Sequence, residues 1–489
     1  MKLIDILKGV ENYKAKGNLE IEINNIQNNS KKVIENDIFV AIKGFDFDGH
    51  DYVTEAVKSG AVAVVLDMSA DLKKIKISKD TTVVIVEDTR KCLAQMAANF
   101  YGNPAKKLRL VGVTGTKGKT TTTFMIKAIL EKAGLKVGLI GTIANYIGDK
   151  CLGESNRTTP DSLELQQTFA QMVKEKVDIV VMEVSSQSLK LDRVNGCKFE
   201  VGVFTNFYKD HISPKEHPDL EDYFNSKSKL FSMCTQGVIN VDDFKSSKII
   251  KNNAKCEFKT YGIDNFSDML AKDITITNTS VDYKLKIKDR NERIKVNIPG
   301  RFSVYNSLAA ITVALKYGAS ADNIKEALLE ITVPGRSELV PNNKELAIMI
   351  DYAHTAESLQ SILEAVKSYT KGNVICVFGC GGDRDSTKRP MMGEVVGKTA
   401  DFAIITTDNP RTENPMDIIN DIEKGIKKTK GKYKIVEDRK KAIEEAIKMA
   451  TKRDIIVLAG KGHEPYQEIN GEKYPFDERI IVKEILKEN

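Results

Sequence analysis

The chain alternates short apolar runs with longer stretches in which apolar residues recur every three or four positions. This alternation predicts parallel strands joined by amphipathic helices that cover both faces of a sheet. Beyond residue 105, the predicted strands are Leu110–Val113, Val137–Ile140, Val177–Met182, Val201–Phe204, Ala347–Ile350, Val374–Phe378, Phe402–Thr406 and Ile455–Ala459. The pattern therefore predicts the α/β fold class.

Interruptions in this pattern divide the chain into three α/β domains. The first part mixes short strands at 37–42, 61–66 and 82–86 with helices at 51–59 and 90–100, and it ends near the GNP segment at 102–104. A second boundary is predicted at VPGRSE, 333–338, because proline and glycine interrupt regular elements. The predicted domains are 1–105, 106–333 and 334–489. The polar, strand-rich stretch 248–298 is predicted to be a β insertion or an edge of the second domain.

Composition narrows the class of protein. A length of 489 residues suits about three domains of ~150 residues. A net charge of +6 is too small and too dispersed to predict nucleic-acid binding. The seven cysteines form no CxxC pair, which favours reduced thiols over a disulfide framework. The N-terminal segment MKLIDILKGVENYK turns polar too early for a signal peptide, and no apolar run approaches the ~18 residues of a membrane span. We therefore expect a soluble cytoplasmic protein.

The strongest chemical signal is LRLVGVTGTKGKTTTT at 108–123. An apolar strand breaks into Gly115 and Gly118, and Lys119 and a row of threonines then open a helix. This arrangement binds phosphate, because backbone N–H groups and the helix N-terminus face the anion, the lysine reaches the outer phosphates and the Thr120 hydroxyl can bind Mg²⁺. The strict P-loop pattern has glycine where this chain has Val113. The strand and helix context still predicts nucleotide binding.

Two further polar residues follow apolar runs in the same predicted sheet. Glu183 ends VDIVVMEVSS, and His211 lies in FTNFYKDHIS after the next strand. Parallel sheets present ligands at the carboxyl ends of their strands, so an acid beside a P-loop is a candidate Mg²⁺ ligand. His211 is either a second site residue or a hydrogen-bonded loop histidine. On spacing alone, Lys227 and Lys229 are surface lysines.

Ten segments occur in the order found in the Mur ligases, namely TGTKGKTTT, MEVSSQSL, TNFYKDH, YFNSKSKLF, PGRFSVYNSLAA, VPGRSE, DYAHT, GCGGDRDSTKRPMMG, TTDNPRTENP and AGKGHEPYQ. The chain thus resembles the Mur ligase family over nearly its whole length, and within it most closely the members that add the third, diamino-acid residue. The resemblance implies a UDP-binding N-terminal α/β domain, a central P-loop ATPase domain with a parallel sheet, and a Rossmann-like C-terminal α/β domain.

The resemblance also implies an activity, an ATP-dependent amide ligation in peptidoglycan precursor synthesis. A carboxylate of UDP-MurNAc-L-Ala-D-Glu is phosphorylated to an acyl phosphate, which the amino group of a diamino acid attacks. The implied cofactors are ATP and two Mg²⁺ ions. The implied partners are the two small-molecule substrates, with no nucleic acid and no membrane, and the implied state is a monomer.

Roles for individual residues follow from the same motifs. The resemblance implies Thr120, Glu183, His211 and Lys227 as Mg²⁺ ligands, Lys227 once it is carbamylated, and Lys119, Lys227 and His211 as catalytic residues. The implied ATP contacts are Gly115, Thr116, Lys117, Gly118, Lys119, Thr120, Thr121, Asn306, Arg336, Asp351 and His354.

For the UDP-sugar peptide, the resemblance implies contacts from Ser30, Thr158, Thr159, Ser185 and Arg193. Here the sequence departs from the family pattern. The usual Asp-Ser-Arg segment reads Asn29-Ser30-Lys31, Arg157 stands where asparagine is common, and Leu191 occupies a position that is often glutamine. These departures leave open a paralogue that acts on another precursor.

Selectivity for the amino acid is expected in the third domain, where the implied contacts are Arg389, Asp408, Asn409, Pro410, Arg411, Gly460 and Glu464. The DNPR segment resembles the form in enzymes that add meso-diaminopimelate. A guanidinium can pair with the distal carboxylate that diaminopimelate has and lysine lacks. Lysine, lanthionine or another amine remains the alternative.

Three other classes of protein share parts of this pattern. A folylpolyglutamate synthetase would share the P-loop and the three domains, but the DNPR and GKGHE segments argue against it. A regulatory GTPase needs a base-reading motif after a strand, whereas TKRD at 451–454 precedes a strand in another domain. A nucleic-acid-binding ATPase needs a basic, aromatic-rich face, and the chain has no tryptophan and no such cluster.

Overall fold

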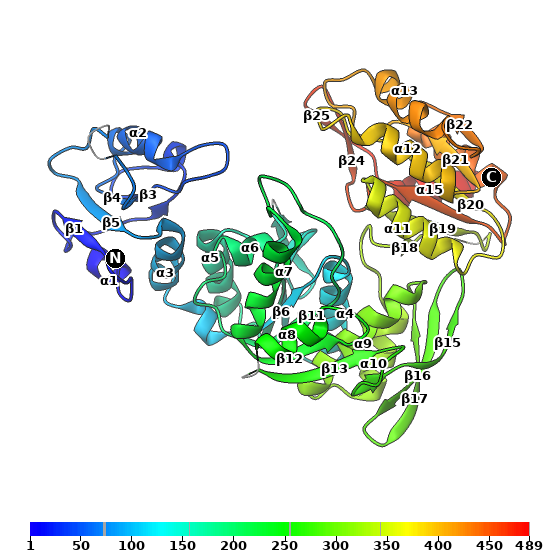
Figure 1. Ribbon diagram of the computed structural model, residues 1–489, viewed down its shortest axis with the longest axis horizontal. Coiled ribbons are helices and arrows are strands. Elements are labelled where there is room, and N and C mark those ends of the chain that lie inside the picture. Colours follow the sequence, from blue (N-terminus) through cyan, green and yellow to red (C-terminus); the bar gives the residue numbers. More distant parts are fainter. Residues whose placement is uncertain (72–74, 156, 254–255, 343, 489) are drawn as a thin grey trace. The chain divides into compact units, whose positions relative to one another are not determined.

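The computed structural model describes residues 1–71, 75–155, 157–253, 256–342 and 344–488 (Figure 1). The chain forms two compact units, one of residues 1–268 with 312–318 and one of 269–311 with 319–489. Both units are built from mostly parallel sheets and helices, which confirms the predicted fold class. None of the described helices combines the length and apolar character needed to cross a membrane.

The first unit begins with a five-stranded sheet. Its elements are α1 (Leu3–Ile6), β1 (Lys14–Lys16), β2 (Ile26–Gln27), η1 (Ser30–Lys32), β3 (Ile38–Val40), η2 (Gly49–Tyr52), α2 (Val53–Lys58), β4 (Ala63–Asp67), β5 (Thr82–Val86) and α3 (Thr89–Phe100). The strand order is β1-β5-β4-β3-β2, and only β1 is antiparallel. Buried apolar residues cover both faces, with α1 and α3 in one cluster and α2 in the other. The strands predicted at 37–42, 61–66 and 82–86 are confirmed as β3, β4 and β5.

A larger sheet forms the rest of the first unit. Its elements are η3 (Pro104–Lys107), β6 (Arg109–Thr114), α4 (Lys119–Lys132), β7 (Val137–Ile140), β8 (Ala144–Ile147), β9 (Lys150–Glu154), α5 (Ser162–Lys174), β10 (Ile179–Glu183), α6 (Ser186–Lys190), β11 (Phe199–Phe204), α7 (Leu220–Ser228), η4 (Lys229–Ser232), β12 (Cys234–Asn240), α8 (Ser246–Asn252) and β13 (Glu257–Gly262). The strand order is β13-β12-β11-β6-β10-β7-β8-β9. Strand β6 lies between β10 and β11, parallel to both, so the loops after these three strands meet at one edge.

The second unit holds the remaining elements. They are β14 (Met269–Leu270), β15 (Lys272–Ile276), β16 (Val281–Ile287), β17 (Arg290–Val296), α9 (Arg301–Lys316, whose last residues belong to the first unit), α10 (Ala321–Glu330), β18 (Glu338–Leu339), β19 (Ala347–Asp351), α11 (Ala356–Lys367), β20 (Val374–Phe378), α12 (Lys388–Thr399), β21 (Phe402–Ile405), α13 (Pro415–Ile426), β22 (Tyr433–Ile435), α14 (Arg439–Met449), β23 (Ile455–Ala459), β24 (Tyr466–Ile469), β25 (Glu472–Pro475) and α15 (Glu478–Glu488). The strand-rich stretch predicted at 248–298 is found in two pieces. Its first part adds β13 to the large sheet, and β15, β16 and β17 form a separate antiparallel sheet.

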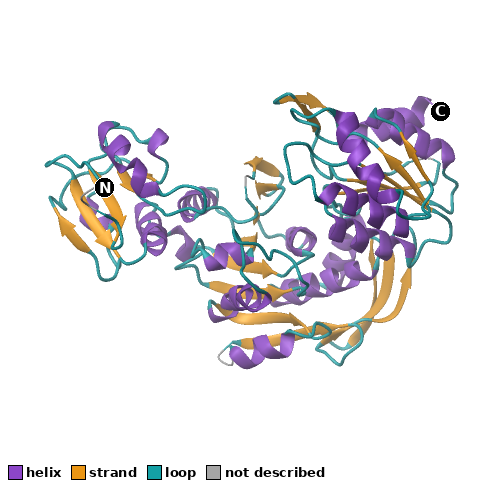
Figure 2. Ribbon diagram, turned by 45° about the horizontal axis from the view of Figure 1, so that its top comes forward, coloured by secondary structure: helices purple, strands orange, loops and turns teal. Residues whose placement is uncertain are grey.

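The C-terminal sheet has the order β18-β19-β23-β20-β21-β22, and only β18 is antiparallel. Helices α11, α12 and α13 bury apolar residues on one face, and α14 and α15 do so on the other (Figure 2). This doubly covered sheet explains why its strands read as continuous apolar runs rather than alternating ones.

Helices α12 and α13 approach so closely that glycines must form their contact. A Cβ atom added to Gly393 would lie 2.0 Å from the carbonyl oxygen of Ile422, and one added to Gly425 would lie 1.8 Å from that of Pro390. Each of these contacts is with backbone, which a side-chain rotation cannot relieve. The two helices therefore need glycine at both positions.

We predict that Gly425→Ala destabilises the C-terminal domain by about 1–3 kcal/mol, because the added methyl group forces the two helices apart. Chemical denaturation followed by circular dichroism measures the change. The neighbouring Lys424→Ala is the control, since that side chain is 69% exposed. Equal stability of the two variants would contradict this account of the helix contact.

Candidate functional site

The loop between β6 and α4 carries the predicted phosphate-binding residues. Gly115 has φ +145° and Gly118 has φ +83°, conformations that other residues rarely adopt. A Cβ atom on Gly115 would lie 1.9 Å from Thr205 Oγ1, so this glycine also permits the loop to approach β11. Val113, the departure from the P-loop pattern, is fully buried within β6, where no glycine is required. The loop geometry of a P-loop is therefore intact.

Residues that follow β11 hold this loop in place. The backbone N–H of Thr116 donates to the carbonyl of Asn206 (3.0 Å), and that of Lys117 donates to Asn206 Oδ1 (2.9 Å). The Thr205 hydroxyl donates to the Lys117 carbonyl (2.7 Å). The TNFYKDH motif thus supports the phosphate-binding loop, a role that its sequence did not reveal for Thr205 and Asn206.

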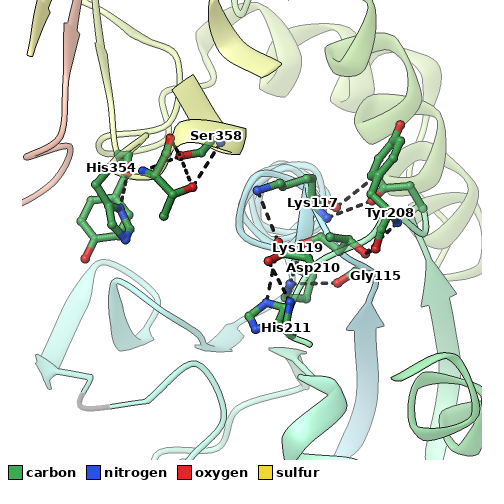
Figure 3. A network of polar contacts seen from close by, with 12 residues as sticks. Gly115, Lys117, Lys119, Tyr208, Asp210, His211, His354 and Ser358 are labelled. Atoms are coloured by element: carbon green, nitrogen blue, oxygen red, sulfur yellow. Dashed lines mark hydrogen bonds and ion pairs between the residues drawn. The ribbon is translucent and has the colours of Figure 1, made fainter. Parts of the chain in front are cut away.

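Two lysines converge on one carbonyl oxygen of this loop. Lys119 Nζ donates to Gly115 O (2.9 Å) and to Thr116 O (3.1 Å). Figure 3 shows Lys119 beside Gly115. Lys227 Nζ donates to the same Gly115 oxygen (2.9 Å) and lies 4.3 Å from the centre of the Tyr223 ring. Burial, with the charge of Lys119 as a second cause, holds the pKa of Lys227 well below its usual value. Lys227 is only 1% exposed, so the alternative of a surface lysine is wrong.

Glu183, at the end of β10, lies against the first turn of α4. The Thr120 hydroxyl donates to Glu183 Oε1 (3.0 Å), and the backbone N–H of Thr142 donates to the same oxygen (2.9 Å). A Cβ atom on Gly141 would lie 2.5 Å from Glu183 Oε1, so the carboxylate depends on glycine beside it. The carboxylate is 1% exposed and is directed at the helix that begins with Lys119 and Thr120.

These oxygens fit Mg²⁺, which prefers hard oxygen donors and is usually held by one or two carboxylates together with substrate phosphates and water. In the part of the chain that is described, no three His, Cys, Asp or Glu side chains gather into a metal site of their own. His211 follows β11, is partly exposed and places Nδ1 3.0 Å from Glu216 Oε1. The residues thus fit a Mg²⁺ ion that is coordinated by both protein and nucleotide oxygens, rather than one held by protein ligands alone.

A buried histidine that the sequence did not single out braces this region. His217 Nδ1 lies 2.6 Å from Asp222 Oδ2, and Nε2 lies 2.9 Å from Ser186 Oγ. The His217 ring packs on Tyr223 (5.0 Å between centroids), whose hydroxyl lies 3.1 Å from Thr116 Oγ1. Burial lowers the pKa of His217, which favours the neutral ring in this network. The only sequence signal was the scarcity of histidine, five in the chain.

A cavity of about 910 Å³ in the first unit holds two of the predicted UDP-sugar contacts, Ser30 and Arg193. Four cationic residues line it, namely Lys31, Arg90, Arg157 and Arg193. All four departures from the family pattern, Asn29, Lys31, Arg157 and Leu191, also line this cavity. The departures therefore alter one site rather than several.

The other predicted UDP-sugar residues connect this region to Glu183. Thr159 Oγ1 donates to the Glu183 carbonyl (2.9 Å) and accepts from the Ser185 N–H (3.0 Å). Arg193 Nη1 donates to the Thr159 carbonyl (3.2 Å), and the Thr142 hydroxyl lies 3.1 Å from Thr158 Oγ1. The predicted residues form one continuous network with the carboxylate.

In the second unit, the predicted amino-acid contacts gather at the carboxyl edge of the C-terminal sheet. Asn409 is central, because its Oδ1 accepts from Lys461 Nζ (2.9 Å) and its Nδ2 donates to Glu464 Oε2 (2.9 Å). Gly460 has φ +116°, and a Cβ atom there would lie 2.4 Å from Asp408 Oδ2. Lys461 is fully buried and was not predicted, although it lies within the GKGHE segment.

Four predicted nucleotide contacts, Asn306, Arg336, Asp351 and His354, lie in the second unit. Asp351 Oδ2 accepts from the Ser337 N–H (2.8 Å), and burial raises the pKa of this carboxyl group. The Arg336 guanidinium lies 4.9 Å from the centre of the Tyr352 ring, and its buried Nε has no hydrogen-bond partner among the residues that the structure describes. His354 Nδ1 lies 2.7 Å from the Tyr352 carbonyl oxygen. Asn306 is buried in α9.

Arg389 occupies a different environment from its predicted partners. Its guanidinium is 3% exposed, with Nη2 2.7 Å from Glu413 Oε1 and Nη1 3.2 Å from Asp421 Oδ2. Arg384, in the same GCGGDRDSTKRPMMG segment, is exposed and makes no hydrogen bond or ion pair with the described residues. The sequence showed both arginines, and only the fold distinguishes the paired one from the accessible one.

The β6–α4 loop, its lysine and the acid on the neighbouring strand define a P-loop nucleotide-binding protein of the α/β type, whose three largest sheets are mostly parallel. Three family models match the chain: the Mur ligase family catalytic domain over 22–101, the Mur ligase middle domain over 113–314, and the Mur ligase glutamate ligase domain over 335–462. The chain belongs to the Mur ligase family, as the order of its motifs predicted.

Individual relatives match from end to end. The chain is 51% identical over 490 residues to the UDP-N-acetylmuramoyl-L-alanyl-D-glutamate--2,6-diaminopimelate ligase of Caldanaerobacter subterraneus subsp. tengcongensis, with 100% of both chains covered. It is 48% identical over 491 residues to the ligase of that name numbered 1 in Clostridium acetobutylicum, again with 100% of both covered. A solved structure of a ligase with this name aligns with a TM-score of 0.70 and 28% identity, covering 100% of this chain and 99% of the other.

Proposed function

We propose that this protein is an ATP-dependent ligase that joins meso-2,6-diaminopimelate to the D-Glu carboxylate of UDP-MurNAc-L-Ala-D-Glu. Residues 1–105 would bind the UDP-sugar, residues 106–333 ATP, and residues 334–489 the amino acid. The full-length similarity to ligases with this name supports the reaction. The observation that carries the choice of amino acid is the guanidinium of Arg411 at the edge where Asn409 and Glu464 also lie. We further propose a cytoplasmic monomer with small-molecule partners only.

The first step transfers the γ-phosphoryl group of ATP to the substrate carboxylate. A carboxylate oxygen attacks phosphorus, the bond to ADP breaks, and an acyl phosphate forms. Both reactants are anions, so the protein must neutralise charge and align them more than supply a nucleophile. Lys119 would reach the outer phosphates once it leaves the Gly115 and Thr116 carbonyls, and the backbone N–H groups at the N-terminus of α4 would bind the remaining oxygens.

The second step forms the amide. The neutral amino group of the incoming amino acid attacks the acyl carbon, the tetrahedral intermediate expels phosphate, and the nitrogen loses a proton. Asp161 also lines the first-unit cavity and pairs with Arg157 and Arg193, so Lys31 and Arg90 are the cations there that suit the diphosphate of a UDP-sugar, which carries negative charge at neutral pH. Lys31 stands where arginine is common in the family and carries the same positive charge. This charge favours the proposed precursor, which is an anion, over an uncharged precursor.

Mg²⁺, two ions in this proposal, would be held by Thr120, Glu183 and His211, and would supply charge neutralisation at the transferred phosphoryl group. Lys227 is the further ligand once it is carbamylated. The reaction with CO₂ requires a neutral amine, and the lowered pKa of Lys227 increases that form. Its burial also shields a carbamate from hydrolysis by bulk water.

The decisive experiment offers diaminopimelate, L-lysine and lanthionine separately to purified enzyme with ATP, Mg²⁺ and UDP-MurNAc-L-Ala-D-Glu. Phosphate release and mass spectrometry of the product are measured. We expect product with diaminopimelate, and loss of at least about 100-fold in phosphate release for Lys119→Ala. Lys132→Ala, at the far end of α4, is the control. Product with another amine would retain the ligase and reject the amino acid, and no product with any amine would favour a paralogue.

Dependence on CO₂ is predicted for Lys227. Removing CO₂ from the buffer lowers the wild-type rate by about tenfold or more, and bicarbonate restores it, because the carbamate is an anion that an ammonium cannot replace. Lys227→Ala has low activity that does not respond to bicarbonate. Lys229→Ala, two residues away and exposed, follows the wild type. A wild-type rate that is indifferent to CO₂ would reject the carbamate.

We also propose that Arg384, rather than Arg389, contacts the distal head of the amino acid. Arg384→Ala is expected to raise KM for diaminopimelate by about tenfold, the loss of one charge-assisted hydrogen bond. Arg389→Ala is expected to lower Tm, since it removes the buried guanidinium that pairs with both Glu413 and Asp421. Amine saturation kinetics and thermal melting distinguish the two. A larger rise in KM for Arg389→Ala at unchanged Tm would reverse the assignment.

A further inference from the structure

Glu468 has no role in the function proposed above, yet it contacts the arginine on which the choice of amino acid depends. Arg411 Nε donates to Glu468 Oε2 (3.0 Å), and Arg411 Nη1 donates to the Gly382 carbonyl (2.6 Å). Among the described residues, Nη2 has no acceptor. The guanidinium is thus fixed at two of its nitrogens, with the third available to a ligand.

The backbone of Glu468 is held as firmly as its side chain. Its N–H donates to Asn409 Oδ1 (3.0 Å), and its carbonyl accepts from the Arg411 N–H (3.0 Å). On the other side of the arginine, the Asn470 N–H donates to the Arg411 carbonyl (2.8 Å). Glu468 therefore cannot move without disturbing both Asn409 and Arg411.

These bonds attach a hairpin to the DNPR loop. Strands β24 and β25 pair antiparallel, and the residues between them, Asn470 and Gly471, have φ of +51° and +80° (Figure 1). Asn-Gly with two positive φ values is the favoured two-residue hairpin turn, and it fixes the register of the strands. The register in turn sets which side chain of β24 faces Arg411.

Arg411 itself adopts a strained conformation, with φ +51°. Non-glycine residues in this region persist when the surroundings impose the conformation, and they are common at ligand sites. The opposite wall is a glycine loop, since a Cβ atom on Gly381 would lie 3.1 Å from Arg411 Nη1. The arginine is thus enclosed by glycine on one side and Glu468 on the other.

The orientation of Arg411 depends on a second acceptor beside the Gly382 carbonyl. A single hydrogen bond to the Gly382 carbonyl would leave the guanidinium free to rotate about that contact, whereas a second bond at Nε fixes its plane. Recognition of a carboxylate by the remaining nitrogen, Nη2, is favoured when that plane is set in advance. We propose that Glu468 is a specificity-determining positioning residue, which orients Arg411 so that Nη2 faces the distal carboxylate of the incoming amino acid.

This inference rests on the proposed function, and the two can be tested apart. The wild-type enzyme is assayed first with diaminopimelate and with L-lysine. Inactivity with diaminopimelate would overturn both proposals. If the wild type is active with diaminopimelate and the Glu468 variants have the same KM and the same preference as the wild type, the inference alone is overturned.

Three variants test the role of Glu468 itself. Glu468→Ala is expected to raise KM for diaminopimelate about tenfold, to leave kcat and the KM for ATP within about twofold, and to reduce the preference for diaminopimelate over L-lysine. Glu468→Gln keeps an acceptor for Nε, so its KM should remain near the wild-type value. Glu472→Ala, on the same hairpin, is the matched control and should change nothing.

The direction of the change decides between two roles for the carboxylate. A lower KM in Glu468→Ala would mean that Glu468 competes with the substrate for Arg411, which would overturn the positioning role. Equal losses in Glu468→Ala and Glu468→Gln would also overturn it, since an acceptor would then be insufficient. A fall in Tm shared with Glu472→Ala would assign the effect to the hairpin fold.

Discussion

The close approach of Gly115 to strand β11 is the constraint on which the nucleotide-binding part of the structure depends. No side chain fits between Gly115 and Thr205. With the loop this close, both Lys119 and Lys227 reach the Gly115 carbonyl. Two ammonium groups at one oxygen repel each other, and the low polarity around Lys227 strengthens that repulsion. The same contact thus holds both lysines at one oxygen, and burial together with the charge of Lys119 lowers the pKa of Lys227.

Both units place polar residues at the carboxyl edge of a parallel sheet and then orient them with a second set of side chains. In the first unit, Thr205 and Asn206 hold the loop, and His217 holds Tyr223 against it. In the second unit, buried Lys461 holds Asn409, which in turn holds the hairpin. Buried polar networks of this kind fix geometry only when each member is satisfied, so a change in a supporting residue displaces the residue that meets the substrate.

The sequence predicted much of the fold, and the reason is local. The apolar runs that form β6, β10 and β23 are buried on both faces, and a fully buried strand must be apolar along its length. The P-loop was equally visible, since Gly115, Lys119 and Thr120 are close in the chain and act within one turn. The family followed from the order of the motifs, although that order did not separate Arg384 from Arg389, because burial depends on the packing of α12 against α13.

By itself, the sequence determined the residue types, the strand periodicity and the loop that binds phosphate, since each of these is encoded within a few neighbouring positions. Only the tertiary structure decided which residues meet across long separations. The Thr120 hydroxyl donates to Glu183, and buried Lys227 donates to the Gly115 carbonyl. Arg411 pairs with Glu468. One cavity is lined by all four departures from the family pattern, Asn29, Lys31, Arg157 and Leu191. Such pairings depend on strand order and hairpin register, which arise from packing of the whole domain and have no signature in a local stretch of chain.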